Sequence, residues 1–419
     1  MDVPDAILLM GDKQWQEIKS RLTGKFNKMM KGLFRQKGAQ LDINILASDE
    51  AQEFITTHAG ILDGGFQNVE MSDKMRERLT RSNYIFSGIK TFHELNEAFP
   101  SMLDENGNKK PFERFLNDVQ KINSTYNANY LHAEYDFVQA SATMAAKWEQ
   151  FSEDGDRYNL QYRTAKDDKV RPEHAALDGV TLPMSDSFWE TYYPPNGWNC
   201  RCTVVQVRKQ KYPATEHAEA MSRGEEAMNG ERYNIFRFNS GKQGKTMPDY
   251  NPYTIKRCND CDVAKGKLKL GFVPDYQLCQ GCIMIRKCNE DRNRDNSAKA
   301  TKKSPEVKKL QGTTISNPDF NHEVLVTGGS IREWTNQPHK DYAAKNSILK
   351  HIAKVFREAN YIGVVDNFKQ KPGVIQSHLF ETTVLGDVSW IVIREYDDGR
   401  FILHSLSDGD RIKTGIRKE

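Results

Sequence analysis

Apolar residues recur at every third or fourth position along two long stretches of the chain, and this spacing places them on one face of a helix. The first stretch covers residues 13–37, where eight basic residues and one glutamate are interspersed. The second runs from Phe112 to about Phe151 and predicts one long helix. A shorter helix is expected from Ser48 to Leu62, because serine is a favoured N-cap residue. The N-terminal part of the chain is therefore predicted to be helical.

Short runs rich in β-branched residues predict strands farther along the chain. One of them, Thr203–Val207, follows a loop dense in Trp, Pro and Gly. In the last hundred residues, a first strand at 323–327 precedes a helical segment and a meander of three strands. These three strands are expected at residues 383–385, 389–394 and 401–405, with Asp397-Asp398-Gly399 as the last hairpin turn. This order of elements is typical of an α+β domain.

The chain of 419 residues is too long for one ordinary core, since domains cluster near ~100–150 residues. Its patterns predict an α+β multidomain protein with four folded parts and two connecting segments. The folded parts are a helical N-terminal region (1–84), a central α+β module (85–210), a zinc ribbon (257–285) and a small α+β domain (320–419). The connecting segments are an irregular connector (211–256) and a basic, flexible linker (286–319), where apolar residues are scarce.

Composition limits the class of protein. Charged residues make up 28% of the chain and apolar residues 38%, and no apolar run approaches the ~18 residues of a membrane span. The acidic start lacks the basic region of a signal peptide, so we expect synthesis in a cytoplasm and reduced thiols. The basic residues of the 13–37 helix leave two interpretations open: a solvated face on a helix docked to its own protein, or a contact with nucleic acid or an acidic partner.

Four of the seven cysteines form two Cys-x-x-Cys pairs separated by 17 residues. These are Cys258, Cys261, Cys279 and Cys282, and their spacing is typical of two knuckles that hold one tetrahedral Zn²⁺. All four ligands would be cysteine thiolates, so the zinc is predicted to be structural. The segment between the knuckles carries too little apolar surface to fold without the ion.

The loop of residues 162–202 contains a second group of possible metal ligands. Cys200 and Cys202 lie close together near its end, and the loop could fold back to bring His174 to them. Three such side chains could hold a metal ion, although they are one ligand short of a closed zinc site. The alternative is a packed, hydrogen-bonded loop in which arginines brace aspartates. The residues expected in that role are Arg163, Arg171, Asp168 and Asp178.

The same loop resembles the core motif of the phage head morphogenesis proteins, the Mu F-like minor head protein family, and the resemblance covers roughly residues 85–210. The matching positions are Arg163, Thr164, Asp168, Arg171, His174, Leu177, Asp178, Gly179, Pro194, Pro195, Gly197, Trp198, Cys200, Arg201 and Cys202. The resemblance implies a minor capsid protein of a tailed phage or prophage, acting near the portal in head assembly and in DNA packaging and ejection. It implies portal and major capsid proteins and phage DNA as partners. It also implies a location inside the head, after synthesis in the bacterial cytoplasm, with entry into the host alongside the DNA.

Five of the ten histidines lie in the last hundred residues, near Lys and Arg. This domain is similar to small nuclease-like domains that phages carry, related to barnase, EndoU, colicin and RelE ribonucleases. The resemblance implies metal-independent RNA cleavage, which needs an acid and a base of near-neutral pKa and cations at the phosphate. The predicted catalytic residues are His339 and His378 as acid and base, Lys340 and Arg394 at the phosphate, and His404 with Ser405 beside it. The alternative is a structural or DNA-binding virion protein whose last domain is a non-catalytic binding module.

Overall fold

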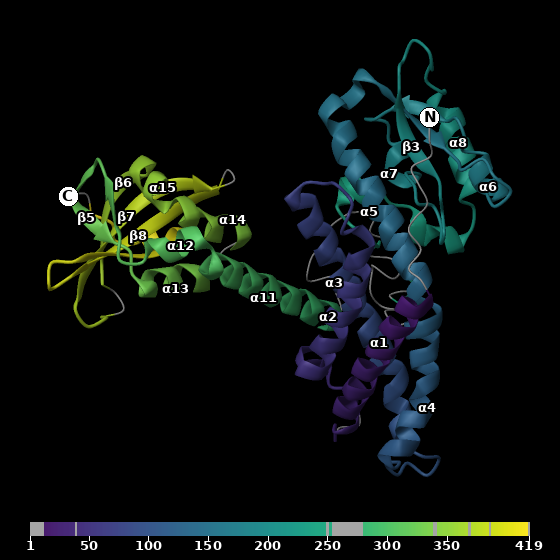
Figure 1. Cartoon of the computed structure of the whole chain (residues 1–419), viewed down its shortest axis with the longest axis horizontal. Helices are drawn as coiled ribbons and strands as arrows, with labels where there is room; N and C mark the ends of the chain where they lie inside the picture. The colour runs from purple at the N-terminus through teal and green to yellow at the C-terminus, as the bar shows by residue number, and fades with distance from the viewer. Residues whose placement is uncertain are drawn as a thin grey trace. The chain divides into compact units, whose positions relative to one another are not determined.

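The computed structural model of the protein describes residues 12–37, 40–248, 251–253, 280–337, 342–367, 370–384 and 387–417. The chain divides into two compact units, Met1–Asn289 and Glu290–Glu419 (Figure 1). Each unit has its own hydrophobic core. No helix in the described ranges is both long enough and apolar enough to cross a membrane.

The N-terminal half of the first unit is helical, as the apolar spacing predicts. Its helices are α1 (Asp12–Phe34), α2 (Asp49–Asp63), α3 (Asp73–Ala98), α4 (Phe112–Ser124) and α5 (Leu131–Asp154), with short 3₁₀ turns at Ile43–Ala47, Gly64–Phe66, Phe99–Met102 and Gly155–Arg157. Ser48 caps α2 as expected, because its side chain accepts a hydrogen bond from the Ala51 amide. The prediction of one unbroken helix over 112–151 is wrong: a π turn, η4 (Thr125–Asn129), separates α4 from α5.

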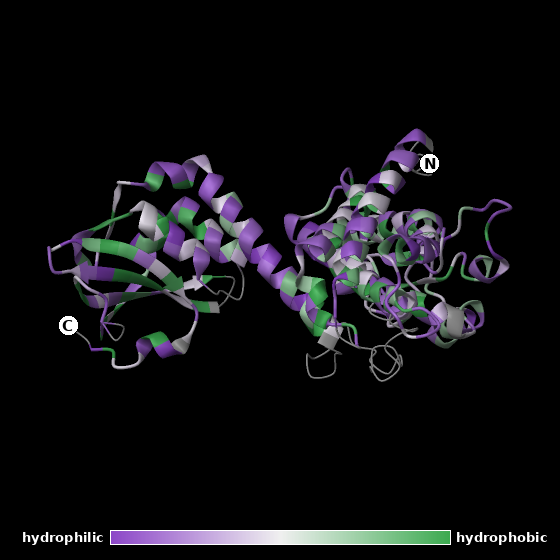
Figure 2. Ribbon diagram, turned by 90° about the horizontal axis from the view of Figure 1, so that it is seen from below, coloured by the Kyte–Doolittle hydropathy of each residue, from purple (hydrophilic) through white to green (hydrophobic). Residues whose placement is uncertain are grey.

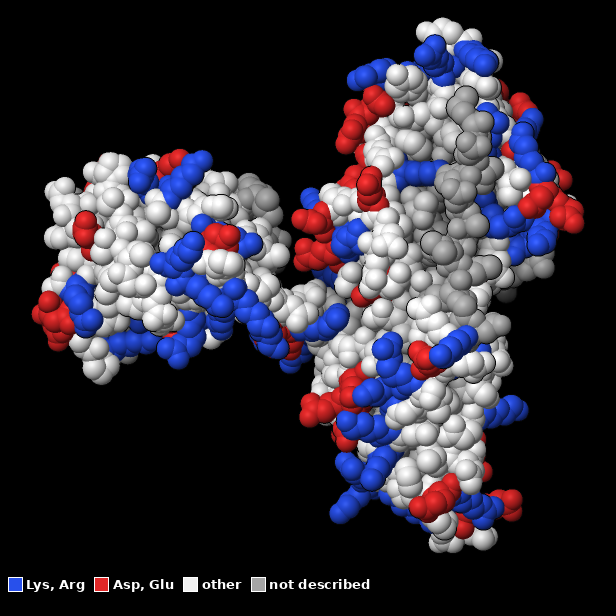
Figure 3. All heavy atoms as spheres, in the orientation of Figure 1, with Lys and Arg blue, Asp and Glu red and all other residues white. Residues whose placement is uncertain are grey.

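The contacts of α1 favour one of its two interpretations. Its apolar face lies in the core of the first unit, where Phe26 is fully buried. On its basic face, Lys25 and Lys28 both pair with Glu53 of α2, the latter at 2.6 Å. Figure 3 shows Lys and Arg interspersed with Asp and Glu over this region. Because part of the positive charge is matched within the same unit, a helix docked to its own protein explains this segment.

The central module is built on a three-stranded antiparallel sheet in the order β2-β1-β3. The strands are β1 (Asn159–Arg163), β2 (Thr181–Pro183) and β3 (Thr203–Val207), and two short helices, α6 (Pro172–Ala175) and α7 (Phe188–Thr191), lie in the connections. The strand predicted at 203–207 is confirmed. The motif-rich loop thus begins and ends on neighbouring strands, which fixes both of its ends.

The segment predicted as an irregular connector is largely folded. It contains α8 (His217–Ala227), η6 (Glu231–Phe236) and α9 (Ser240–Gln243). Phe236 and Phe238 are buried in the core of the first unit, and both rings contact Phe137 of α5. These aromatic side chains follow no helical or strand period along the sequence, because they pack singly against α5 and the central loop. The expectation of an irregular connector is therefore wrong for this segment.

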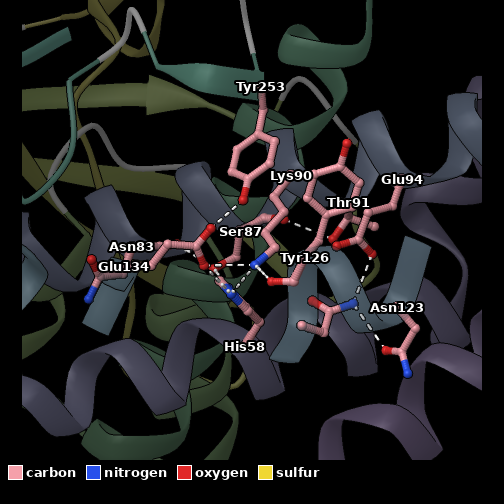
Figure 4. A network of polar contacts seen from close by, with 11 residues as sticks. His58, Asn83, Ser87, Lys90, Thr91, Glu94, Asn123, Tyr126, Glu134 and Tyr253 are labelled. Carbon is pink, nitrogen blue, oxygen red and sulfur yellow. Dashed lines mark hydrogen bonds and ion pairs between the residues drawn. The ribbon is translucent and has the colours of Figure 1, made fainter. Parts of the chain in front are cut away.

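The helices of the first unit enclose a buried polar network (Figure 4). Lys90 of α3 donates its three N–H bonds to Glu134 Oε2 at 2.7 Å, the Tyr126 carbonyl at 2.7 Å and His58 Nε2 at 3.0 Å. His58 in turn donates from Nδ1 to Ser87 at 2.8 Å. Tyr126 lies in the π turn, so the break between α4 and α5 places a backbone acceptor at the buried ammonium.

The network holds one buried ion pair. Burial opposes ionisation of Glu134, but the charge of Lys90 outweighs it and lowers the carboxyl pKa to about 2. Burial, with the charge of Lys90, lowers the pKa of His58 to about 4. At neutral pH the imidazole is therefore uncharged, and the positive charge of Lys90 is balanced by Glu134.

The pKa of a second buried carboxyl group in the same region, that of Glu94, is shifted in the opposite direction. Burial raises the pKa of Glu94 to about 8, and its Oε1 has no hydrogen-bond partner in the described part of the chain. A carboxyl pKa raised by folding stabilises the native state below the unfolded pKa, and this contribution is lost as pH rises through 8.

Glu94→Gln keeps the shape of the protonated acid but does not titrate. We therefore compare the free energy of unfolding of the variant with that of the wild type at each pH. The variant should gain ~1–2 kcal/mol relative to the wild type between pH 5 and pH 8. Urea unfolding at the two pH values measures this difference. The exposed Glu105→Gln is the matched control and should show no such trend. If the free energies of unfolding of Glu94→Gln and the wild type differ by the same amount at both pH values, the prediction is contradicted.

The second unit is the predicted α+β domain. Its sheet has the order β4-β5-β9-β8-β7-β6, with only β5 and β9 parallel. The strands are β4 (Thr314–Asn317), β5 (Phe320–Leu325), β6 (Asn360–Asp366), β7 (Val374–Val384), β8 (Asp387–Tyr396) and β9 (Phe401–Ser407). The helices are α13 (Gly328–Asn336), α14 (Tyr342–Ser347) and α15 (Ile352–Glu358), with 3₁₀ turns at Ile348–His351 and Asp410–Lys413. Hydrophobic positions alternate with polar ones along its strands (Figure 2). The strands predicted at 389–394 and 401–405 are confirmed within β8 and β9. The strand predicted at 383–385 coincides only with the end of β7, and Leu385 lies outside the described residues.

The stretch predicted as a flexible linker is helical over most of its length. It contains part of α11 (Gln280–Lys303), all of α12 (Pro305–Leu310) and β4. Among its few apolar residues, Ala298, Val307 and Ile315 are buried. Lys, Arg and Ala are good helix formers, so a helix needs little apolar surface here. The prediction of flexibility is therefore wrong for these residues, and the boundaries of the other predicted parts stay predictions.

Candidate functional site

The central loop brings three possible metal ligands together. His174 on α6 and the two cysteines before β3 are all buried. Nδ1 of His174 lies 3.6 Å from Sγ of Cys200 and 3.7 Å from Sγ of Cys202, and the three atoms all lie within 4.8 Å of one another. The fold-back expected from the sequence is therefore present.

Hydrogen bonds hold the two ends of this loop. Oδ1 of Asp178 accepts from the Thr164 amide at 2.8 Å and from the Thr164 hydroxyl at 3.1 Å. Gly179 adopts φ +83°, a left-handed conformation that favours glycine, and its amide donates to the Tyr162 carbonyl. The Leu-Asp-Gly part of the motif is thus a turn that ties α6 back to β1.

The arginines do not make the contacts expected of them. The carboxylate of Asp178 is bonded by Thr164, and Arg171 donates to the Trp198 carbonyl. Arg201 instead forms a two-pronged ion pair with Asp167. The prediction that Arg163 and Arg171 brace Asp168 and Asp178 is wrong, because Thr164, held beside the turn at Gly179, already supplies the hydrogen bonds that Asp178 requires.

Aromatic side chains attach the loop to the helices. Trp189 is fully buried and donates from Nε1 to the Pro183 carbonyl at 3.0 Å, while Tyr193 donates to the Met144 carbonyl of α5 at 2.9 Å. Trp198 is half-buried and lies against Phe137, with ring centroids 5.1 Å apart. The motif-rich loop is therefore an integral part of the core of the first unit.

The two thiols of the cluster differ in acidity. A hydrogen bond from Cys202, together with His174, lowers the pKa of Cys200 well below its usual range, against the effect of burial. The same hydrogen bond and burial raise the pKa of Cys202. The contacts of Cys200 thus favour its thiolate, which is the form that binds a soft metal ion.

Most of the predicted zinc ribbon lies outside the described residues, including Cys258, Cys261 and Cys279. Cys282 is described: it lies on α11 and is buried in the core of the first unit. The four-cysteine site and its structural zinc stay a prediction.

A second polar cluster lies on the sheet of the C-terminal unit. His378 of β7 is buried, and its Nε2 lies 3.0 Å from Glu395 Oε2 and its Nδ1 3.0 Å from the Tyr361 hydroxyl. Gln376 donates to the same Glu395 oxygen at 2.8 Å. Burial disfavours ionisation of Glu395, but the contacts with Gln376 and His378 and the charge of His322 lower its pKa overall. A histidine between a carboxylate and a phenol is an arrangement that can move a proton.

The other predicted catalytic residues do not join His378. His339 and Lys340 lie outside the described residues. Arg394 directly precedes Glu395 on β8, so its side chain points to the opposite face of the sheet. Ser405 is paired with Val392 on that opposite face, and His404 occupies a bulge of β9. The predicted grouping of His378 with Arg394, His404 and Ser405 is wrong, because neighbouring strand positions alternate between faces.

Sequence reasoning missed Tyr361, Gln376 and Glu395. The signal was the alternation Gln376-x-His378, which places two polar side chains on one face of a strand that is apolar beyond them. Their partner Glu395 required the register of β7 against β8, which the sequence does not give. The exposed His322 stacks on Phe401 at 4.1 Å and extends this cluster on the same sheet.

Two family models match parts of the chain. Residues 105–205 match the model described as Phage Mu protein F like protein. Residues 293–403 match the model described as Large polyvalent protein-associated domain 3. The first match includes all the motif positions singled out in the central loop. The second covers most of the C-terminal unit and confirms no nuclease activity.

Two curated phage or prophage proteins are similar to part of this chain. The putative capsid assembly protein F of Escherichia phage Mu is 36% identical over 104 residues, which is 25% of this chain and 21% of that protein. The Mu-like prophage FluMu F protein of Haemophilus influenzae is 25% identical over 198 residues, 46% of this chain and 42% of that protein. The chain thus spans less than half the length of either relative. No solved structure matches it significantly. The central segment, with its turn at Asp178-Gly179 and its Cys200-Arg201-Cys202 end, is therefore similar to the Mu F-like phage proteins.

Proposed function

We propose that the protein takes part in assembly of a phage head as a minor capsid component. The observation that carries this proposal is the match of residues 105–205 to the Mu F-like family and to a putative capsid assembly protein. The buried loop anchors, the Asp178 turn and the packing on α5 are consistent with a rigid module for protein–protein contacts.

The proposed role also implies particular partners and a location for the protein. The partners would be the portal and major capsid proteins, and the protein would lie inside the head near the portal during DNA packaging and ejection. It would be made in the bacterial cytoplasm and could enter the host with the DNA. Exposed lysines on α11 and α12 support a nucleic-acid partner, since phosphate groups bind such residues (Figure 3). They are Lys302, Lys303, Lys308 and Lys309.

Association with heads is the direct test of this role. DNA-filled heads are purified by density gradient from cells producing the phage, and the protein is identified in them by mass spectrometry. We expect it to sediment with the heads and to remain after a high-salt wash that removes loosely bound proteins. Its absence from purified heads and from head precursors would contradict the proposal.

A second candidate function is RNA cleavage by the C-terminal unit. The observation that favours it is the His378–Glu395–Tyr361 cluster, in which one imidazole is held between a carboxylate and a phenol. In this proposal His378 exchanges a proton with the 2′-hydroxyl or the leaving oxygen, Glu395 orients the ring, and His322 lies nearby as a cation for the phosphate. The substrate would be host RNA.

RNA cleavage is tested with the purified full-length protein, tRNA and total RNA, with and without EDTA. We expect cleavage that EDTA does not abolish. Absence of cleavage under both conditions would remove the enzymatic role and leave the assembly role, with the C-terminal unit as a binding module.

A further inference from the structure

The separations within the His174, Cys200 and Cys202 cluster match those around a metal ion. In a tetrahedral zinc site, Zn–S bonds of about 2.3 Å and Zn–N bonds of about 2.0–2.1 Å place neighbouring sulfur and nitrogen ligands about 3.5 Å apart. The two sulfur-to-nitrogen separations in the cluster are 3.6 and 3.7 Å. Both separations between the imidazole and a thiol therefore fit binding to a shared ion.

We propose that His174, Cys200 and Cys202 bind one Zn²⁺ ion, which links α6 to the start of β3. Two thiolates and one imidazole are the ligand types that select zinc, and they balance the charge of the divalent ion. The inference does not depend on the role in head assembly, because it rests on the ligands alone.

The surroundings support a built site. All three ligand residues are at most 9% exposed. Nδ1 of His174 faces both sulfurs. The far nitrogen, Nε2, is buried and has no hydrogen-bond partner in the described part of the chain, so a metal bond at Nδ1 would fix the ring.

The fourth coordination position is left open. Within the described ranges, no other His, Cys, Asp or Glu joins the three ligand atoms. The guanidinium of Arg171 lies on this side of the loop: a side chain at Gly197 would meet its Nη1 at 2.8 Å. We assign the fourth position to a water molecule, so the site differs from a closed four-cysteine knuckle.

The proposal also gives a reason for the loop geometry. The helix α6 has only four residues, too few to hold its position by its own hydrogen bonds. Zinc would connect it to β3 across 26 and 28 residues of sequence. Loss of the ion should therefore loosen residues 164–202 before the helices of the first unit unfold.

Zinc content tests the proposal in the full-length protein. The Cys258→Ser/Cys279→Ser variant lacks two ligands of the predicted four-cysteine zinc site and serves as the background for the other substitutions. Any zinc that it retains therefore belongs to another site. We expect this background to keep about one zinc per chain by elemental analysis. Adding His174→Ala or Cys200→Ser/Cys202→Ser should remove that zinc, whereas adding Cys288→Ser, at a half-buried cysteine outside the cluster, should not.

A second measurement covers the case in which the ligand variants do not fold. X-ray absorption of the zinc-loaded background protein, with its central loop unchanged, should give two sulfur ligands at about 2.3 Å and two lighter ligands. Absence of zinc from the background, or bound zinc with four or no sulfur ligands, would overturn the proposal.

Discussion

Glu134→Gln is expected to destabilise the first unit by ~3–5 kcal/mol. Glu134 is buried and is the carboxylate that balances Lys90, which it contacts at 2.7 Å. The neutral amide of the variant would leave the ammonium buried without its counter-ion, and removing one partner of a buried pair costs about that much. Hydrogen exchange of peptides from α3 and α5 during urea unfolding measures the loss in this unit separately from the second one.

A double variant distinguishes the cost of the unpaired charge from the cost of altered packing. Replacing both partners, as Lys90→Met/Glu134→Leu, removes the uncompensated charge, and such replacements are often close to neutral. We expect this variant to be more stable than Glu134→Gln alone. Glu153→Gln on the same helix, at an exposed position, is the matched control and should cost less than ~1 kcal/mol. A Glu134→Gln effect as small as that of the control would contradict the account of the network.

His378→Ala is expected to slow RNA cleavage by ~10²–10⁴-fold if the C-terminal unit is the nuclease proposed above. The ring contacts the Tyr361 hydroxyl and the Glu395 carboxylate, each at 3.0 Å. Glu395→Gln should lower activity less, because it leaves the imidazole in place but weakens its orientation. Initial rates on tRNA, with circular dichroism to verify folding, measure both effects.

A matched control uses the residues that the structure places away from His378. Arg394 lies on the opposite face of the sheet, so Arg394→Ala should change the rate far less than His378→Ala does. Full activity of His378→Ala, or equal losses for the two variants, would contradict the assignment of His378 to the reaction.

Features set by nearby residues were predictable from the sequence. The Ser48 cap, the α1 face and the strand at 203–207 each depend on a few adjacent positions, and the structure contains all three. The approach of His174 to Cys200 and Cys202 was one of two possibilities that the sequence left open, and the pairing of β1 with β3 closes the loop that brings them together. Short-range patterns thus predicted individual elements and candidate ligands, but not the pairing that joins them.

Features that depend on distant partners were not predictable. His58 and Glu134 are 76 positions apart, and no local pattern marks Lys90 as the residue between them. The π turn replaces one turn of a helix whose apolar spacing continues on both sides. In the C-terminal unit, a shift of one position decides whether Arg394 or Glu395 faces His378, and this register comes from tertiary packing.

Complementation of a phage that lacks this gene tests the central claim, that the Mu F-like module serves head assembly. Without the gene, the number of DNA-filled heads counted by electron microscopy should fall. The wild-type protein and its His378→Ala variant should restore them equally, because the assembly role does not use the C-terminal cluster. A normal number of DNA-filled heads in the absence of the gene would contradict the account.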